Sequence, residues 1–101
     1  MARVGFGDMV KAVVDVSREI MAAGGELHAD EEALLLEEGS RQGDLWGINL
    51  YPTETSPEWI EFDSMINVRP ARGNRSRDVE DEETRAIIRR IVESLVAGRQ
   101  G

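Results

Sequence analysis

The chain has 101 residues and no cysteine, which is the length of one domain and excludes disulfides, thiolate metal sites and cysteine nucleophiles. With 41% hydrophobic and 32% charged residues, its composition is that of a soluble globular domain with one core. The net charge of −8 disfavours nucleic-acid and anionic-membrane binding, and the absence of a signal peptide or an apolar membrane-spanning stretch predicts a cytoplasmic protein.

A β-hairpin is predicted after a loose lead-in of residues 1–8. Residues 9–16 are rich in valine and alternate imperfectly, residues 17–19 suit a tight turn, and residues 20–23 return as a second strand. A single helix across residues 9–23 is the competing interpretation. The four valines of the first segment favour the hairpin.

The segment after the double glycine predicts a short helix. Asp30 stands where an N-cap is expected, and the acidic residues that follow it complement the positive end of the helix dipole. Three leucines at 34–36 fan over much of the helix circumference, so this helix should be largely covered or pack against a partner. Gly39 is the expected stop. A strand over residues 33–38 is the alternative.

Two more strands and a second helix are predicted in the rest of the chain. Residues 45–51 alternate well, and residues 59–69 show the clearest period-2 pattern of all, which is typical of a sheet with one buried face. After a loop, Asp78 or Asp81 should cap a helix whose apolar residues form a continuous stripe. Gly98 should end this helix and leave residues 99–101 as a tail.

The predicted order is β-β-α-β-β-α, which gives one α+β domain over residues 9–98 with a four-stranded, mainly antiparallel sheet. We expect both helices on one face of the sheet, with the other face partly open. On that open face, a hairpin of the two later strands would place Asn49 near Glu61 and Tyr51 near Trp59. The expected core residues are Ile60, Phe62, Ile66, Val68, Ile88, Ile91 and Leu95.

Four motifs spread over residues 9–96 carry a resemblance to a known family. They are HADEEALLLEEGS, LWGINLYP, IEFDSMINVRP and GNRSRDVED. In this order and spacing they resemble a small family of uncharacterised bacterial and archaeal proteins, described as a domain of unknown function. The resemblance implies a small domain of unknown function and carries no activity that transfers to this chain.

The only histidine, His28, precedes the acidic cluster and is the first candidate site. With Asp30 and Glu32, its imidazole could ligate a divalent metal or act in acid–base catalysis, as in a hydrolase. Ligands on one helix prefer an i, i+4 spacing, so His28 and Glu32 share a face only if the helix begins early. The sequence favours a structural role, because acidic first turns are expected and no second histidine completes a zinc set. We therefore expect no bound metal or cofactor.

The second candidate site is a run of arginines just before the last helix. Residues 69–77 contain four arginines and no acidic residue, and their guanidinium forks could hold a phosphate or carboxylate. The acidic residues that follow could instead pair with them on the surface, where each pair contributes little. The candidate ligand-binding residues are Arg69, Arg72, Asn74, Arg75 and Arg77.

The sequence favours a small non-catalytic binding or interaction domain over an enzyme. It contains no Walker loop, no nucleophile elbow and no dinucleotide-binding fingerprint. A half-covered sheet and the three leucines predict a homodimer, while a small-anion binder and a hydrolase at His28 are the alternatives. Because both helices should start from one edge of the sheet, we expect His28 and Asp30 to approach Arg75, with an Asp30–Arg75 salt bridge as the structural outcome.

Overall fold

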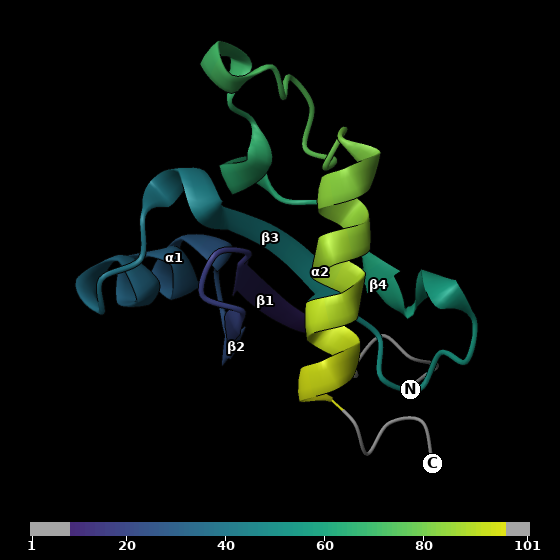
Figure 1. Ribbon diagram of the computed structural model, residues 1–101. Coiled ribbons are helices and arrows are strands. Elements are labelled where there is room, and N and C mark those ends of the chain that lie inside the picture. Colours follow the sequence, from purple (N-terminus) through teal and green to yellow (C-terminus); the bar gives the residue numbers. More distant parts are fainter. Residues whose placement is uncertain (1–8, 97–101) are drawn as a thin grey trace.

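Residues 9–96, which the computed structural model describes, form a four-stranded antiparallel sheet with strand order β2-β1-β3-β4 and two α-helices (Figure 1). The strands are β1 (Val10–Asp15), β2 (Ile20–Gly25), β3 (Leu45–Leu50) and β4 (Ile60–Glu61), and the helices are α1 (His28–Glu37) and α2 (Glu82–Leu95). The predicted α+β class and element order are confirmed. The predicted lead-in, the stop at Gly98 and the tail lie outside the described residues.

The first hairpin forms as expected, and the competing helix over the same residues is wrong. β1 pairs with β2 on one side and with β3 on the other, so its residues Ala12, Val13 and Val14 are fully buried. The buried Asp15 closes the turn, because its Oδ1 accepts hydrogen bonds from the backbone N–H groups of Ser17 and Arg18 at 2.8 and 2.9 Å.

Helix α1 begins two residues earlier than Asp30, so the prediction of Asp30 as its N-cap is wrong. Leu27 occupies the N-cap position and supplies no side-chain hydrogen bond, and His28 is the first helical residue. The start of the helix is instead held by Glu31, whose Oε2 accepts a 2.8 Å hydrogen bond from the N–H of Gly25 at the end of β2. Gly39 follows the helix with a φ of 106°, as expected of a stop, and the alternative strand over residues 33–38 is wrong.

The two helices lie on opposite faces of the sheet, which corrects the prediction of one shared face. Helix α2 packs on a cluster that includes Val14 and Ile48, whereas Leu35 of α1 packs with Val13 and Leu45. Because β1 and β3 carry apolar side chains on both of their faces, covering only one face would leave the other hydrophobic face in water. Within the described residues, neither helix is long and apolar enough to cross a membrane.

The long strand predicted for residues 59–69 is wrong beyond β4, which covers only Ile60–Glu61. Ser64 interrupts it by accepting a hydrogen bond from the N–H of Ile66, and a 3₁₀ turn follows over Met65–Asn67. The side chain of Asn67 then bonds the outer edge of β3: its Oδ1 accepts from Gly47 N–H at 2.8 Å and its Nδ2 donates to Gly47 C=O at 3.0 Å. One amide group therefore takes the place of the next strand residue.

The predicted core is partly confirmed. Ile60, Ile88 and Ile91 are buried, and Phe62 and Ile66 are partly buried against the two clusters. Val68 is also partly buried. Leu95 is wrong as a core residue, because 52% of it is exposed in the last turn of α2. Of the two predicted caps, Asp78 and Asp81, the structure uses Asp81, which accepts a hydrogen bond from Thr84 N–H at 2.9 Å.

We expect Asn67→Ala to lower the free energy of unfolding by about 2–4 kcal/mol, because it leaves buried backbone groups at Gly47 without partners. The measurement is urea denaturation followed by circular dichroism. Gln42→Ala is the control, since it removes an exposed amide of similar chemistry. Equal midpoints for the two variants would contradict the assigned role of Asn67.

Candidate functional site

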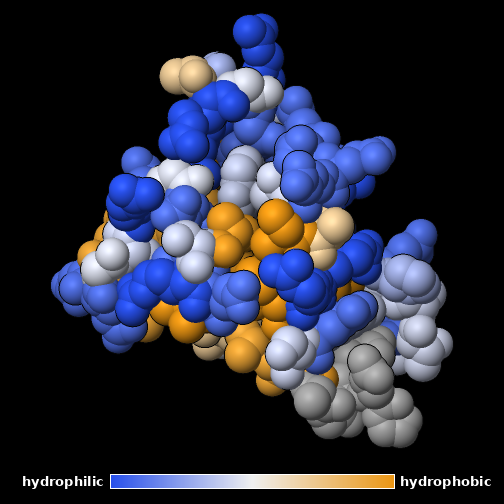
Figure 2. All heavy atoms as spheres, viewed as in Figure 1, coloured by the Kyte–Doolittle hydropathy of each residue, from blue (hydrophilic) through white to orange (hydrophobic). Residues whose placement is uncertain are grey.

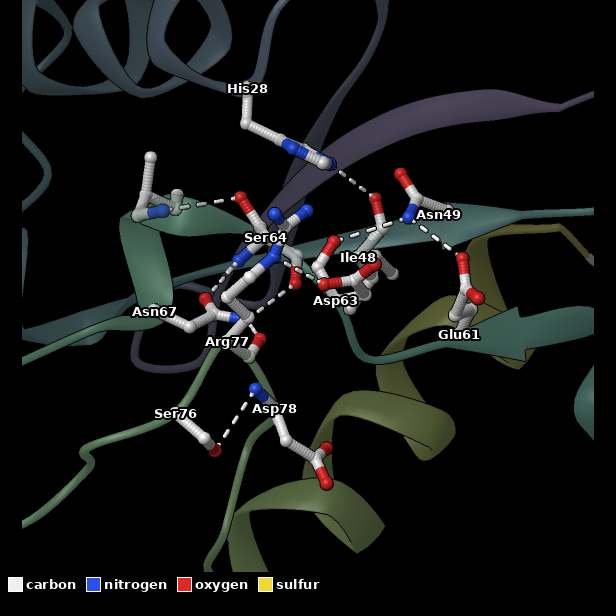
Figure 3. A network of polar contacts seen from close by, with 12 residues as sticks. His28, Ile48, Asn49, Glu61, Asp63, Ser64, Asn67, Ser76, Arg77 and Asp78 are labelled. Carbon is white, nitrogen blue, oxygen red and sulfur yellow. Dashed lines mark hydrogen bonds and ion pairs between the residues drawn. The ribbon is translucent and has the colours of Figure 1, made fainter.

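His28 projects from the first turn of α1 onto the sheet, where it is partly buried (Figure 3). Its Nε2 lies 2.8 Å from the carbonyl oxygen of Ile48 in β3, so Nε2 carries the proton and donates it to this bond. Burial lowers the pKa of His28, although the hydrogen bond to Ile48 acts in the opposite direction. His28 is therefore a neutral imidazole that ties α1 to the central part of the sheet.

A row of polar side chains crosses the sheet beside His28. Asn49 and Glu61 are direct cross-strand partners, and Asn49 Nδ2 donates to Glu61 Oε1 at 2.9 Å. The Tyr51 hydroxyl donates to the same carboxylate oxygen at 3.0 Å, and Tyr51 N–H donates to Trp59 C=O at 2.8 Å. The predicted neighbours Asn49–Glu61 and Tyr51–Trp59 are thus confirmed, and Glu61 is the shared acceptor of this row.

Asp63 joins this row to the arginine segment. Its backbone carbonyl accepts from Asn49 Nδ2 at 3.1 Å, and its Oδ1 forms a 2.7 Å ion pair with Arg77 Nε. The charge of Asp63 also acts on His28 and raises its pKa slightly against the effect of burial. Asp63 therefore acts on both His28 and Arg77, while no hydrogen bond or ion pair joins His28 to Arg75 among the described residues. In the described part of the chain, Asp30 and Arg75 form no ion pair.

The three candidate catalytic residues point toward different partners. The early start of α1 does give His28 and Glu32 an i, i+4 spacing, yet His28 bonds Ile48 and Glu32 lies 3.7 Å from Arg69 Nη2. Asp30 lines the groove between α1 and β2. Among residues 9–96, no three His, Asp or Glu side chains are grouped so that they could hold a metal ion. The structure thus places the three candidates in separate surroundings.

The side chain of Asn74 holds the arginine segment together through hydrogen bonds to the backbone. It is 5% exposed, and its Nδ2 lies 2.7 Å from the carbonyl oxygens of both Asn67 and Asp78. Its Oδ1 accepts from Glu80 N–H at 2.8 Å. With its amide bonded to backbone on both sides, Asn74 fixes the course of the chain between the 3₁₀ turn and α2.

The four arginines divide into two that line one pocket and two that lie outside it. Arg69 is the most enclosed, with 12% of its side chain exposed and its guanidinium 5.0 Å from the centre of the Trp46 ring. Arg72 lies beside it and lines the same pocket. Arg75 is exposed, and Arg77 is paired with Asp63. Of the five predicted ligand-binding residues, the structure brings Arg69 and Arg72 together in one pocket.

Glu31, one of the acidic residues of the predicted first turn, is a titratable group whose burial the sequence did not predict. It is 4% exposed, and burial raises its pKa to about 7, against the hydrogen bond from Gly25 N–H, which lowers it. Its Oε1 is buried without a hydrogen-bond partner among the described residues. A buried carboxyl group at the junction of α1 and β2 therefore makes this junction sensitive to pH.

Comparison with known proteins identifies one match. A family model described as a protein of unknown function (DUF5674) matches residues 1–95. No curated protein matches the chain. No solved structure matches it either.

We expect Glu31→Gln to stabilise the protein at pH 8 and to lose this advantage as the pH falls to 4.5. Because the pKa of Glu31 is raised in the folded state, the wild type loses stability as the pH rises from about 4.5 to about 7. Each unit of pKa shift corresponds to about 1.4 kcal/mol, so the gain at pH 8 should be on the order of 1–3 kcal/mol.

The measurement is urea denaturation of wild type and variant at a series of pH values. Glu26→Gln is the matched control, since Glu26 is exposed in the same connection. A stability difference between Glu31→Gln and the wild type that does not change with pH would contradict the burial of an ionisable Glu31.

Proposed function

The chain belongs to this family of unknown function, DUF5674, and we propose that it is a non-catalytic interaction domain that pairs with a second copy of itself through β2. The observation that carries the proposal is that the outer edge of β2 is not paired with another strand. β2 hydrogen-bonds to β1 on one side only and ends the sheet on the other.

The outer edge of β2 lacks the usual protection of an edge strand. Residues Ile20–Gly25 include no charged residue and no proline, which are the common means of preventing one sheet edge from pairing with another. A register shift opposite Gly24 disturbs only the end of the strand. The regular part, residues 20–23, therefore offers backbone donors and acceptors to an added strand.

Exposed apolar residues lie on both sides of this edge. On the α1 face, a groove of about 500 Å³ separates β2 from α1, and it is lined by Leu34, which is 48% exposed. On the α2 face, Leu95 is 52% exposed and lines a pocket together with Glu19, the residue before β2. Figure 2 shows hydrophobic residues at the surface between α1 and the C-terminal half of α2, where β2 lies. A strand added to β2 would lie between Leu34 and Leu95 and cover both.

A second copy is the partner that this edge suits best. Two β2 strands can pair antiparallel about a twofold axis, which joins the two sheets and closes the assembly as a dimer. Pairing of β2 with the opposite edge of another copy would build an open chain of molecules. That opposite edge is poor for pairing, because β4 is two residues long and Asn67 occupies the β3 edge beyond it.

The net charge adds a testable property to this dimer. Each copy carries a net charge of −8, so two copies repel each other, while the uncharged β2 strands themselves do not. Added salt screens the repulsion and leaves backbone pairing and apolar contact intact. The dimer should therefore become stronger as the ionic strength rises.

We expect sedimentation velocity to show a dimer at about 50 µM, a concentration at which an interface of modest size is populated. Ala23→Lys should give a monomer, because it places a charge on the exposed face of β2. The matched control is Ala86→Lys, which makes the same change at an exposed position of α2 away from this edge and should remain a dimer.

Two outcomes contradict the proposal. One is a wild-type monomer at 50 µM in both low and high salt. The other is a dimer that Ala23→Lys and Ala86→Lys weaken equally, since this would locate the interface elsewhere or reduce it to an effect of net charge.

A further inference from the structure

A second pocket lies away from β2, and no residue of β2 lines it. It has a volume of about 330 Å³ and lies between the turn at Gln42–Asp44 and the segment around Pro70–Arg72. Its size falls within the range of small-molecule sites. The residues that line it are Gln42, Gly43, Ile66, Val68, Arg69, Ala71 and Arg72.

The guanidinium of Arg69 has hydrogen-bond donors without an acceptor among the described residues. Both Nη1 and Nη2 are buried and have no hydrogen-bond partner among the described residues. The carboxylate of Glu32, at 3.7 Å from Nη2, is close enough for an ion pair but not for a hydrogen bond. Buried donors without partners destabilise the folded protein, so a ligand that supplies acceptor atoms to this guanidinium should bind favourably.

Arg72 adds a second guanidinium to the same pocket. It makes no ion pair within residues 9–96, and it lies across Gly43 so closely that a Cβ at this position would collide with it. Among the described residues, Glu32 is therefore the only carboxylate that pairs with either arginine, and it pairs with Arg69. Two positive charges against one negative charge leave the pocket with one unit of surplus positive charge in a protein whose net charge is −8.

We propose that this pocket binds a small organic monocarboxylate, with its carboxylate between Arg69 and Arg72. Two planar guanidinium groups suit a planar carboxylate, which accepts several hydrogen bonds. A surplus of one charge matches a monoanion and not a phosphomonoester, which carries close to two charges. The apolar side chains of Ile66, Val68 and Ala71 provide contact for a short aliphatic body.

Trp46 and Gln42 provide NMR signals that report on binding in this pocket. The Arg69 guanidinium rests on the Trp46 ring, so a change in its surroundings should shift the indole N–H resonance. The Gln42 side chain donates to Glu32 Oε2 at 3.5 Å and lines the pocket, so its amide resonances report on the same site. These two signals do not depend on the state of β2, so they test this proposal independently of dimer formation.

The experiment is a titration of the ¹⁵N-labelled full chain with sodium butyrate at constant ionic strength. We expect saturable shifts of the Trp46 indole and Gln42 amide signals. Titration with n-butanol, which has the same aliphatic body without the charge, should give no such shifts. Arg72→Gln should weaken butyrate binding at least about tenfold, because it removes the surplus charge. The matched control Arg75→Gln loses the same charge from the same segment outside the pocket and should bind as the wild type does.

Four results would overturn the proposal: no saturable shift with butyrate, equal shifts with butanol, equal affinity in Arg72→Gln and wild type, or binding of inorganic phosphate without binding of butyrate. Arg72 is exposed and outside the core, so its replacement leaves a folded protein to measure. Circular dichroism of the variant checks this.

Discussion

The close contact between Gly47 and Asn67 is the constraint on which the second half of the fold depends. At this point β3 is paired with β1 on one side and has no strand on its outer side, where the Asn67 amide supplies both an acceptor and a donor to the Gly47 backbone. The contact requires a glycine, because a Cβ at position 47 would come within 2.6 Å of the Ser64 side chain. The sheet edge is thereby closed by a side chain, and the chain is free to leave it.

This contact also determines where the polar groups lie. Asn67 Nδ2 donates to the Arg77 backbone carbonyl at 2.9 Å, which brings the end of the arginine segment back to the sheet. Arg77 then reaches Asp63, beside His28, while Arg69 is left on the other side of the turn, over Trp46. The return of the chain to the sheet at Asn67 therefore determines the positions of both the polar row and the arginine pocket.

The sequence predicted the parts of the fold that local patterns determine. The valine-rich hairpin, the acidic start and glycine stop of α1 and the apolar stripe of α2 each follow from spacing and turn chemistry. It missed the break after β4, because the alternation over residues 59–69 suits a strand, whereas the competing side-chain bonds of Ser64 and Asn67 depend on tertiary contacts. It missed the opposite placement of the helices, although the apolar residues on both faces of β1 are a signal for it.

For the candidate site, the sequence found the relevant residue types but not their grouping. It proposed Arg69 and Arg72 together with Asn74, which the structure uses for internal backbone bonds. Trp46 beneath Arg69 could not be predicted, since the contact joins two segments that are distant in the sequence. The most direct test of the account is the scalar coupling across the hydrogen bond of Gly47 N–H, measured by NMR. We predict coupling to the side-chain carbonyl carbon of Asn67, whereas coupling to the backbone carbonyl of Asp63, as in a continued β4 strand, would contradict it.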